Sequence, residues 1–332
     1  MLKFKETDQF NSVQGALMKR KEIEAIVDEI VDGEYDNIFF IGIGGTYASS
    51  MQVVQHIKEL SSLPAFVEHA AEYLTTGNKS LTKNSIVVFS SVSGTTEEVV
   101  EAITKIRKEV GAKIIGFVDI PNTILGDLSD YLVIYPKNEQ LKFFMIADRF
   151  IQRRGEFDEY EELYRELDTY LPSALVEVEK SAEEFGRRFA EKHHNDPIHY
   201  FVGAGNQMGA TYSYAMCYWE EQHWIRTKSI HASEFLHGMF EIVDCDTNVT
   251  VFLGEDSQRP LAERVANFLP QICRNYELID SKDYELKGIS EKFRGHISHH
   301  VMMAVTRRID AYIEKLNCHP MEIRRYYRQL DY

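Results

Sequence analysis

A short run of hydroxyl side chains is the part of this sequence best suited to bind a charged ligand. Two serines and two threonines surround Gly94 there, namely Ser91, Ser93, Thr95 and Thr96. Residues 86–89 are β-branched or aromatic, and apolar residues after the run recur at three- and four-residue spacing, which predicts a strand, a turn and a helix. Because the first amides of a helix lack partners and attract anions, the run predicts a phosphate-binding turn. Alternatively, a hydroxyl only caps the helix.

Such a turn must follow a strand of a sheet, and the chain contains several strand-like segments. In the first half these are residues 37–43, 65–67, 85–89, 113–118 and 131–134, separated by helical patterns. Residues 138–192 show charged helical periodicity without a strand, and strands return at 198–203, 249–253 and 277–279. This alternation predicts an α/β fold with two doubly wound parallel sheets, each flanked by helices.

The second group of strands repeats the first. Phe40, Ile41, Gly42 and Gly44 correspond to Phe201, Val202, Gly203 and Gly205, each 161 positions later, which predicts an internal duplication. We expect a first domain at 15–155, a helical connector at 156–195 and a second domain at 196–332. No serine-rich turn follows the strand at 249–253. Only the first half is therefore predicted to bind phosphate.

Two kinds of cofactor site fit the sequence poorly. A dinucleotide fingerprint needs a third small residue where Tyr47 and Met208 stand in the two repeats. The histidine pairs His193–His194 and His299–His300 lack a matched set of carboxylate or cysteine ligands. We expect neither a nicotinamide cofactor nor a metal.

Composition and charge exclude further classes of protein. No apolar run in the 332 residues approaches the roughly 18 needed to cross a bilayer, and the N-terminal residues lack the apolar core of a secretory signal. We expect a cytoplasmic protein without membrane contact, whose four cysteines are free thiols. The net charge of −15 would repel nucleic acid. The short basic runs 19–21 and 324–325 are interpreted as solvated surface.

The duplicated pattern with the turn Ser91–Thr96 resembles the sugar isomerase (SIS) family of phosphosugar-binding proteins. In that family the turn S-x-S-G-x-T holds the sugar phosphate. The resemblance therefore implies that phosphate is bound by residues after the first and third strands: Gly45, Thr46, Ser91, Ser93 and Thr96. Tyr47 stands where the family has a further hydroxyl, which leaves that contact open.

Residues 221–238 resemble the isomerase half of glucosamine-6-phosphate synthase. This resemblance implies a catalytic glutamate at Glu221 and a ring-opening histidine at His237, sixteen positions later, with His231 and Glu234 supporting them. Taken alone, Glu221 could lie on a solvated helix face and His237 could end a helix. The synthase itself is not expected, because no glutaminase region precedes the first strand and the tail 317–332 contains no lysine.

The tail and residues 230–243 resemble deglycases that act on fructoselysine 6-phosphate, with Met239 as a departure from the usual proline. The resemblance implies cleavage of a 6-phosphorylated sugar–amino acid adduct to glucose 6-phosphate and the amino acid, through an enaminol and a Schiff base and without a cofactor. Glu221 would move the proton, its pKa raised in a partly closed apolar pocket near Trp219 and Trp224. His237 would open the sugar ring and assist the attacking water.

Other functions remain open on the sequence. An aldose–ketose phosphosugar isomerase could use the same two residues, and a deglycase could act on a glucoselysine-type adduct. A sugar-phosphate-sensing regulator is less favoured, because the segment before Asn37 is too short and acidic for a DNA-binding helix-turn-helix. We expect a small-molecule phosphosugar conjugate as partner, and a homo-oligomer, at least a dimer, because relatives build the site between subunits. The sequence leaves the conjugated amino acid open.

Overall fold

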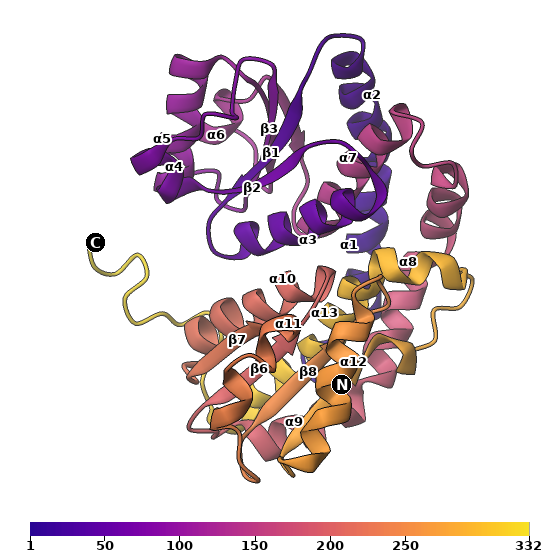
Figure 1. Cartoon of the computed structure of the whole chain (residues 1–332), viewed down its shortest axis with the longest axis vertical. Helices are drawn as coiled ribbons and strands as arrows, with labels where there is room; N and C mark the ends of the chain where they lie inside the picture. Colours follow the sequence, from indigo (N-terminus) through magenta and orange to yellow (C-terminus); the bar gives the residue numbers. More distant parts are fainter. Residues whose placement is uncertain (332) are drawn as a thin grey trace. The chain divides into compact units, whose positions relative to one another are not determined.

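Two parallel β-sheets organise residues 1–331, the part of the chain that the computed structural model describes (Figure 1). Each sheet belongs to one compact unit. The N-terminal unit is Phe10–Pro172, and the C-terminal unit combines Met1–Gln9 with the chain from Ser173 onward. The division falls inside helix α8 (Tyr160–Ser181), within the predicted connector 156–195, whereas the predicted domain limits stay predictions.

The N-terminal unit contains a five-stranded sheet in the order β2-β1-β3-β4-β5. Its strands are β1 (Asn37–Gly42), β2 (Ala65–His69), β3 (Ser85–Ser91), β4 (Lys113–Val118) and β5 (Tyr131–Ile134). Strands β1 and β3 are buried along their whole length, because a central parallel strand is covered on both faces and needs a continuous apolar run. The predicted strands of this half are confirmed.

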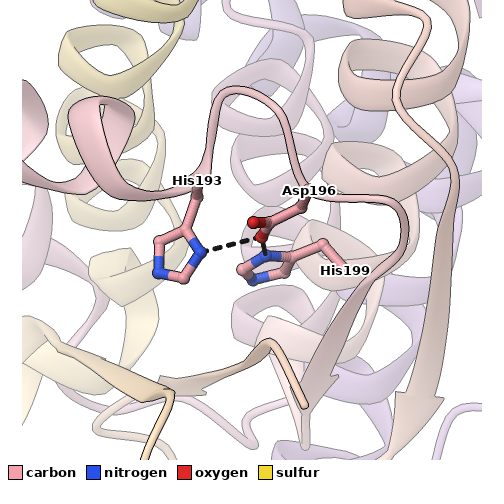
Figure 2. Close-up of side chains that lie close together, drawn as sticks. All are labelled: His193, Asp196 and His199. Atoms are coloured by element: carbon pink, nitrogen blue, oxygen red, sulfur yellow. Dashed lines mark hydrogen bonds and ion pairs between the residues drawn. The ribbon is translucent and has the colours of Figure 1, made fainter. Parts of the chain in front are cut away.

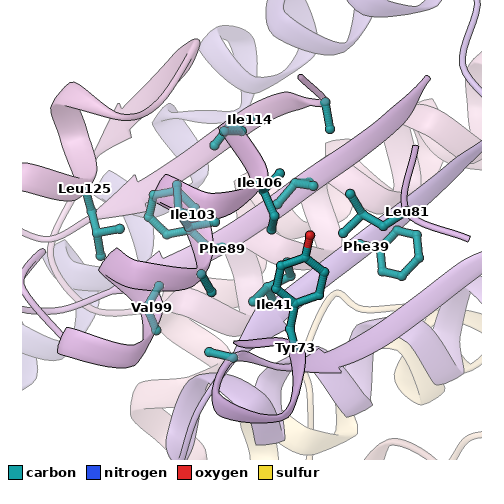
Figure 3. Close-up of a cluster of buried hydrophobic side chains, with 14 of the residues drawn as sticks. Phe39, Ile41, Tyr73, Leu81, Phe89, Val99, Ile103, Ile106, Ile114 and Leu125 are labelled. Carbon is teal, nitrogen blue, oxygen red and sulfur yellow. The ribbon is translucent and has the colours of Figure 1, made fainter. Parts of the chain in front are cut away.

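Helices cover both faces of this first sheet (Figure 1). One side carries α2 (Arg20–Val31), α3 (Gly45–Leu60) and α7 (Glu139–Arg153), and the other carries α4 (Ala70–Thr76), α5 (Glu97–Lys105), the π-helix η1 (Ile106–Val110) and α6 (Ile124–Asp127). Figure 3 shows the apolar core on the second side, a cluster in which Phe89 lies beside Ile103 and Phe39 lies beside Leu81. Helix α1 (Glu6–Met18) precedes the sheet in the chain.

The C-terminal unit contains a four-stranded sheet in the order β7-β6-β8-β9. Its strands are β6 (His199–Gly203), β7 (Thr227–His231), β8 (Val249–Leu253) and β9 (Tyr276–Asp280). The α-helices are α9 (Glu183–His193), α10 (Asn206–Ser213), α11 (Ala232–Phe235), α12 (Arg259–Phe268) and α13 (Glu291–Asn317). The π-helix η2 (Tyr214–His223) and the short 3₁₀ segments η3 (Met239–Ile242), η4 (Leu269–Gln271) and η5 (Ser281–Asp283) complete the unit.

The two sheets repeat one connectivity, since β2-β1-β3-β4 and β7-β6-β8-β9 have the same order along the chain. This agreement confirms the predicted α/β class and fits an internal duplication. Residues 138–192 are helical, in α7, α8 and α9, as their periodicity predicts. No helix within residues 1–331 has the length and apolar character of a membrane span.

Strand β7 is absent from the sequence prediction. It lies at the edge of the second sheet, and its residues Thr227–His231 are half-buried or exposed. An edge strand needs no continuous apolar run when its faces are incompletely buried, as those of β7 are. The polar sequence of β7 therefore carries little strand signal, although β7 ends at the predicted site residue His231.

Candidate active site

The predicted phosphate-binding residues follow the two strands between which the strand order of the first sheet reverses. The connection after β1 leads to β2 on one side of the sheet order, and the connection after β3 leads to β4 on the other side. Open parallel sheets bind ligands at the carboxyl ends of the strands flanking such a point. Gly45 and Thr46 follow β1, and the turn Ser91–Thr96 follows β3, so both predicted segments belong to one edge of the sheet.

The turn after β3 is held by its own hydroxyls. The Gly94 amide donates to Ser91 Oγ at 3.0 Å, and the hydroxyls of Ser91 and Thr96 share a hydrogen bond at 3.3 Å. Gly94 has φ +63°, and a Cβ atom there would collide with the side chain of Thr123. Glycine is therefore required twice, for the left-handed backbone and for the close approach.

The capping alternative can be tested on helix α5. Thr96 is its N-cap residue, but the Thr96 side chain makes no capping hydrogen bond. Ser93 Oγ instead accepts from the Thr95 amide at 3.3 Å and from the Thr95 hydroxyl at 3.2 Å. These hydroxyls shape the turn and do not close the end of the helix, which favours an anion site over a simple cap.

The turn after β1 offers open space. Gly44 has φ +60°, and a Cβ atom built on it would meet no atom within 4 Å. The Thr46 hydroxyl accepts from the Ile43 amide at 3.1 Å and donates to the Ile43 carbonyl at 3.0 Å. Thr46 therefore braces this turn with its side chain, and its backbone amide belongs to the first turn of α3, where amides lack partners within the helix. The Tyr47 ring packs edge-on against His69, 5.2 Å between centroids.

A half-buried acid and a buried lysine lie next to these segments, and sequence reasoning missed both. Glu139, at the start of α7, bonds to the hydroxyls of Ser49 and Ser90, and burial raises the pKa of its carboxyl group. Lys142, fully buried, donates from Nζ to the Tyr135 carbonyl at 2.6 Å. Burial lowers the pKa of Lys142. Neither residue stands in a recognisable motif, so no sequence signal marks them.

The corresponding turn of the second sheet is already occupied by an acid. Gly205, after β6, has φ +61°, and a Cβ atom there would collide with the Asp256 carboxylate. Asp256 Oδ2 accepts from the Asn206 amide at 2.9 Å, and Gln258 Oε1 accepts from the Gly205 amide at 3.1 Å. The chain's own carboxylate thus occupies the place where the first sheet leaves open space.

Glu221 lies on the π-helix η2, a rare geometry that often marks functional sites. Its side chain is 38% exposed, and Oε1 accepts from Arg324 Nε at 2.8 Å. The expected apolar enclosure is not found around it in this unit, because Trp219 is fully buried and the neighbour of Glu221 is a guanidinium. Adjacent Glu220 accepts from the Thr227 hydroxyl at 2.9 Å and so ties η2 to β7.

The C-terminal tail docks beside Glu221. Trp224 ends η2 with φ +61°. Its ring lies 4.0 Å from the His319 ring, and the Arg325 guanidinium lies 4.0 Å from its centroid. The interpretation of the basic run 324–325 as solvated surface therefore holds for Arg325, which is exposed, and is wrong for Arg324, which is half-buried against Glu221. Contacts made across a hundred residues leave no local sequence signal.

His237 lies in the loop between α11 and η3, and its side chain is exposed. Nearby His231 accepts at Nδ1 from the Ser233 amide at 3.1 Å. Burial lowers the pKa of His231, against the opposing effects of Glu234 and Gln258. Glu234 is exposed. Within residues 1–331 no contact joins Glu221 to His237, so their proposed cooperation stays a prediction.

A third set of polar side chains lies at the opposite end of the second sheet. Figure 2 shows His193, Asp196 and His199, with Asp196 Oδ2 2.8 Å from His193 Nδ1 and 2.7 Å from His199 Nδ1. Three such side chains could hold a metal ion, so His193 does have the acidic neighbour that the sequence analysis did not find. His199 Nε2 also bonds to the Thr250 hydroxyl at 2.7 Å. These distances are those of hydrogen bonds, and the expected absence of a metal stays a prediction.

Comparison with known proteins agrees with this geometry. Residues 34–149 match the SIS domain family, and this stretch covers most of the N-terminal unit. The chain is 26% identical to a fructosamine deglycase of Bacillus subtilis, over 96% of this chain and 99% of that protein. It is 25% identical to a fructoselysine 6-phosphate deglycase of Escherichia coli, over 92% and 89%.

Solved structures extend the likeness to the whole fold. A candidate phosphosugar isomerase of Bacillus subtilis matches with a TM-score of 0.90 and 26% identity, over 96% of this chain and 99% of that one. The C-terminal domain of glucosamine-fructose-6-phosphate aminotransferase from Francisella tularensis matches with a TM-score of 0.76 and 14% identity, over 93% and 95%. The SIS-type fold and the predicted resemblance to deglycases are confirmed.

Proposed function

We propose that this protein is a deglycase that cleaves a 6-phosphorylated sugar–amino acid adduct, such as fructoselysine 6-phosphate, to glucose 6-phosphate and the free amino acid. The observation that carries the proposal is the contrast between the two glycine turns. One is open beside a serine-rich turn, and the other is filled by Asp256. Similarity to two deglycases along nearly the whole chain supports the same conclusion.

In this proposal the N-terminal unit binds the 6-phosphate. The amides after β1 and the hydroxyls of Ser93 and Thr96 can donate to phosphate oxygens, at the positive end of a helix dipole. The phosphate is remote from the carbons that react. Its binding energy can therefore fix the orientation of those carbons.

The C-terminal unit supplies the proton-transfer groups. The ketosamine carries a ketone at C2 and the amine at C1. Glu221 would remove a proton from C1 to give the enaminol and return it to C2, which leaves a Schiff base between C1 and nitrogen. Water adds to C1, and the C–N bond breaks to release the amine and the aldose. One carboxylate serves both carbons because they are adjacent.

His237 would open the sugar ring and later assist the attacking water, because imidazole exchanges protons near neutral pH. The exposed position of His237 requires a further surface to enclose the substrate. This requirement supports the proposal of an assembly of at least two chains. No step in this sequence of reactions needs a cofactor.

The direct test incubates the purified protein with fructoselysine 6-phosphate and follows release of glucose 6-phosphate. We expect release without added cofactor. Fructose 6-phosphate, with and without ammonia, is run in parallel. Conversion of fructose 6-phosphate alone would identify an aldose–ketose isomerase, and no release from any ketosamine 6-phosphate would exclude the deglycase.

A further inference from the structure

The C-terminal tail presents a fixed guanidinium group at the proposed catalytic glutamate. Arg324 donates from Nε to Glu221 Oε1 at 2.8 Å, and its Nη1 donates to the carbonyls of Met321 and Ile323. The side chain is only 21% exposed. Arg324 is thus held on two sides, by the tail backbone and by Glu221.

One edge of this guanidinium remains available. Within residues 1–331 the Nη2 atom of Arg324 has no hydrogen-bond partner, although Nε and Nη1 both have one. The tail that carries it is anchored on Trp224, with His319 and Arg325 each 4.0 Å from the indole ring. A cation on a short, anchored segment loses little freedom when it binds a second group.

The chemistry of the proposed substrate offers a matching group. Besides the phosphate, a sugar–amino acid adduct carries a carboxylate on its amino acid part, and arginine binds carboxylates with paired, charge-assisted hydrogen bonds. We propose that Arg324 binds the carboxylate of the amino acid that leaves, which makes the tail a specificity element of the active site. This inference rests on the proposed deglycase function.

Distances support the assignment. Glu221 must come within about 3 Å of C1 to move its proton, and Arg324 Nε lies 2.8 Å from the Glu221 oxygen. The guanidinium is therefore within about 6 Å of C1. In a glycine adduct the carboxyl carbon is three bonds from C1, or about 4 Å. That carboxylate can reach Arg324 while C1 faces Glu221.

Binding in this way lets one guanidinium contact both the base and the substrate. Arg324 Nε holds the Glu221 carboxylate. A substrate carboxylate bound at Nη2 would leave that bond in place. The arginine then sets the distance between the carboxylate and Glu221, so an amino acid part of matching length brings C1 to the base.

The test compares two substrates that differ only in the carboxylate, the 6-phosphates of fructosylglycine and fructosylmethylamine. We expect wild type to prefer the glycine adduct by about 30-fold in kcat/KM, the effect of a charge-assisted hydrogen bond. Arg324→Gln should lose this preference, because the glycine adduct loses about 30-fold more in kcat/KM than the methylamine adduct. Adducts of β-alanine and 4-aminobutyrate, whose carboxylates lie progressively farther from C1, should depend progressively less on Arg324.

Arg328→Gln, on the same tail, is the matched control and should keep the preference. Equal losses on both adducts in Arg324→Gln would show that the arginine acts only through Glu221, and would overturn the inference. Equal kcat/KM values of wild type on the glycine and methylamine adducts would also overturn the inference. If no adduct is cleaved, the proposed function fails, while calorimetric binding of the two adducts still decides whether Arg324 recognises the carboxylate.

Discussion

The turns at Gly44 and Gly205 have the same backbone conformation but differ in what lies beside the glycine. Gly44 and Gly205 both adopt left-handed φ angles, +60° and +61°, at the start of a helix after the first strand of a sheet. Open space lies beside Gly44, whereas the carboxylate of Asp256 lies beside Gly205. The two turns therefore share one backbone geometry, and of the two the turn at Gly44 leaves the space beside the glycine open.

The carboxylate beside Gly205 stabilises the start of helix α10 in its own unit. A carboxylate at the first amides of a helix satisfies unpaired donors and interacts favourably with the helix dipole. Asp256 does this for α10 without a ligand, and Gln258 adds a second acceptor. The C-terminal unit is therefore locally complete at this edge. Its proposed chemistry comes from η2, the following loop and the tail.

The largest expected effect separates chemistry from phosphate binding. Glu221→Gln should reduce turnover of the ketosamine 6-phosphate by about 10³-fold, the usual contribution of a general acid–base group. Binding of fructose 6-phosphate, measured by calorimetry, should change little. Glu220→Gln is the control, because Glu220 only ties η2 to Thr227. Full activity in the Glu221 variant would mean that another residue moves the proton.

The next effect tests the serine-rich turn after β3, the second part of the proposed phosphate site. Replacing two hydroxyls together, Ser93→Ala with Thr96→Val, should raise KM by about 100-fold with kcat less affected, because hydrogen bonds to a charged group are lost. Thr95→Ala, an exposed neighbour in the same turn, should leave KM nearly unchanged. An unchanged KM in the double variant would remove this turn from the phosphate site.

The residues at the amino ends of the two sheets differ as well, and the pH dependence of stability should reveal this difference. Strand β1 begins at Asn37, whose amide side chain donates to the Ser80 carbonyl, whereas β6 begins at His199. Burial lowers the pKa of His199 to about 4 from 6.5. Between these values the unfolded chain binds a proton that the folded chain does not. The contribution of neutral His199 to the free energy of unfolding is therefore present above about pH 6.5 and is lost as the pH falls toward 4.

Urea unfolding at pH 7 and pH 5 measures this loss, which we expect to be about 2 kcal/mol from His199. His193 works in the opposite sense, since bonds to Asp196 and Glu277 raise its pKa despite burial. His300, whose pKa burial lowers to about 3, adds to the acid loss. His199→Gln isolates the first contribution and should shrink the difference between the two pH values. An equal difference in variant and wild type would contradict the assignment.

The smallest effect concerns the filled turn. Asp256→Ala should lower the free energy of unfolding by about 1 kcal/mol, as loss of an N-terminal acceptor usually does. Inorganic phosphate should raise the unfolding midpoint of this variant more than that of wild type, because the vacated turn again resembles the open one. If phosphate stabilises both proteins equally, the turn at Gly205 does not bind phosphate even without the Asp256 carboxylate, despite its similar backbone.

The strands β1, β3, β6 and β8 could be predicted because each is a largely buried apolar run that is followed by a glycine-containing or hydroxyl-rich turn. Edge strand β7 could not be predicted, because its residues are half-buried or exposed and largely polar and so form no apolar run. The turn Ser91–Thr96 was predictable from hydroxyl spacing alone. The partners of Glu221 and His193 were not, because Arg324 and Asp196 become neighbours only through folding.

The sequence by itself determined the α/β class, the duplication and the hydroxyl turn, because periodicity and local spacing encode strands, helices and the turns between them. The tertiary structure decided which turn stays open, which carboxylate fills the other and which arginine holds Glu221. Those outcomes depend on side chains tens to a hundred residues apart in the chain. Only packing of whole elements brings such side chains within hydrogen-bonding distance.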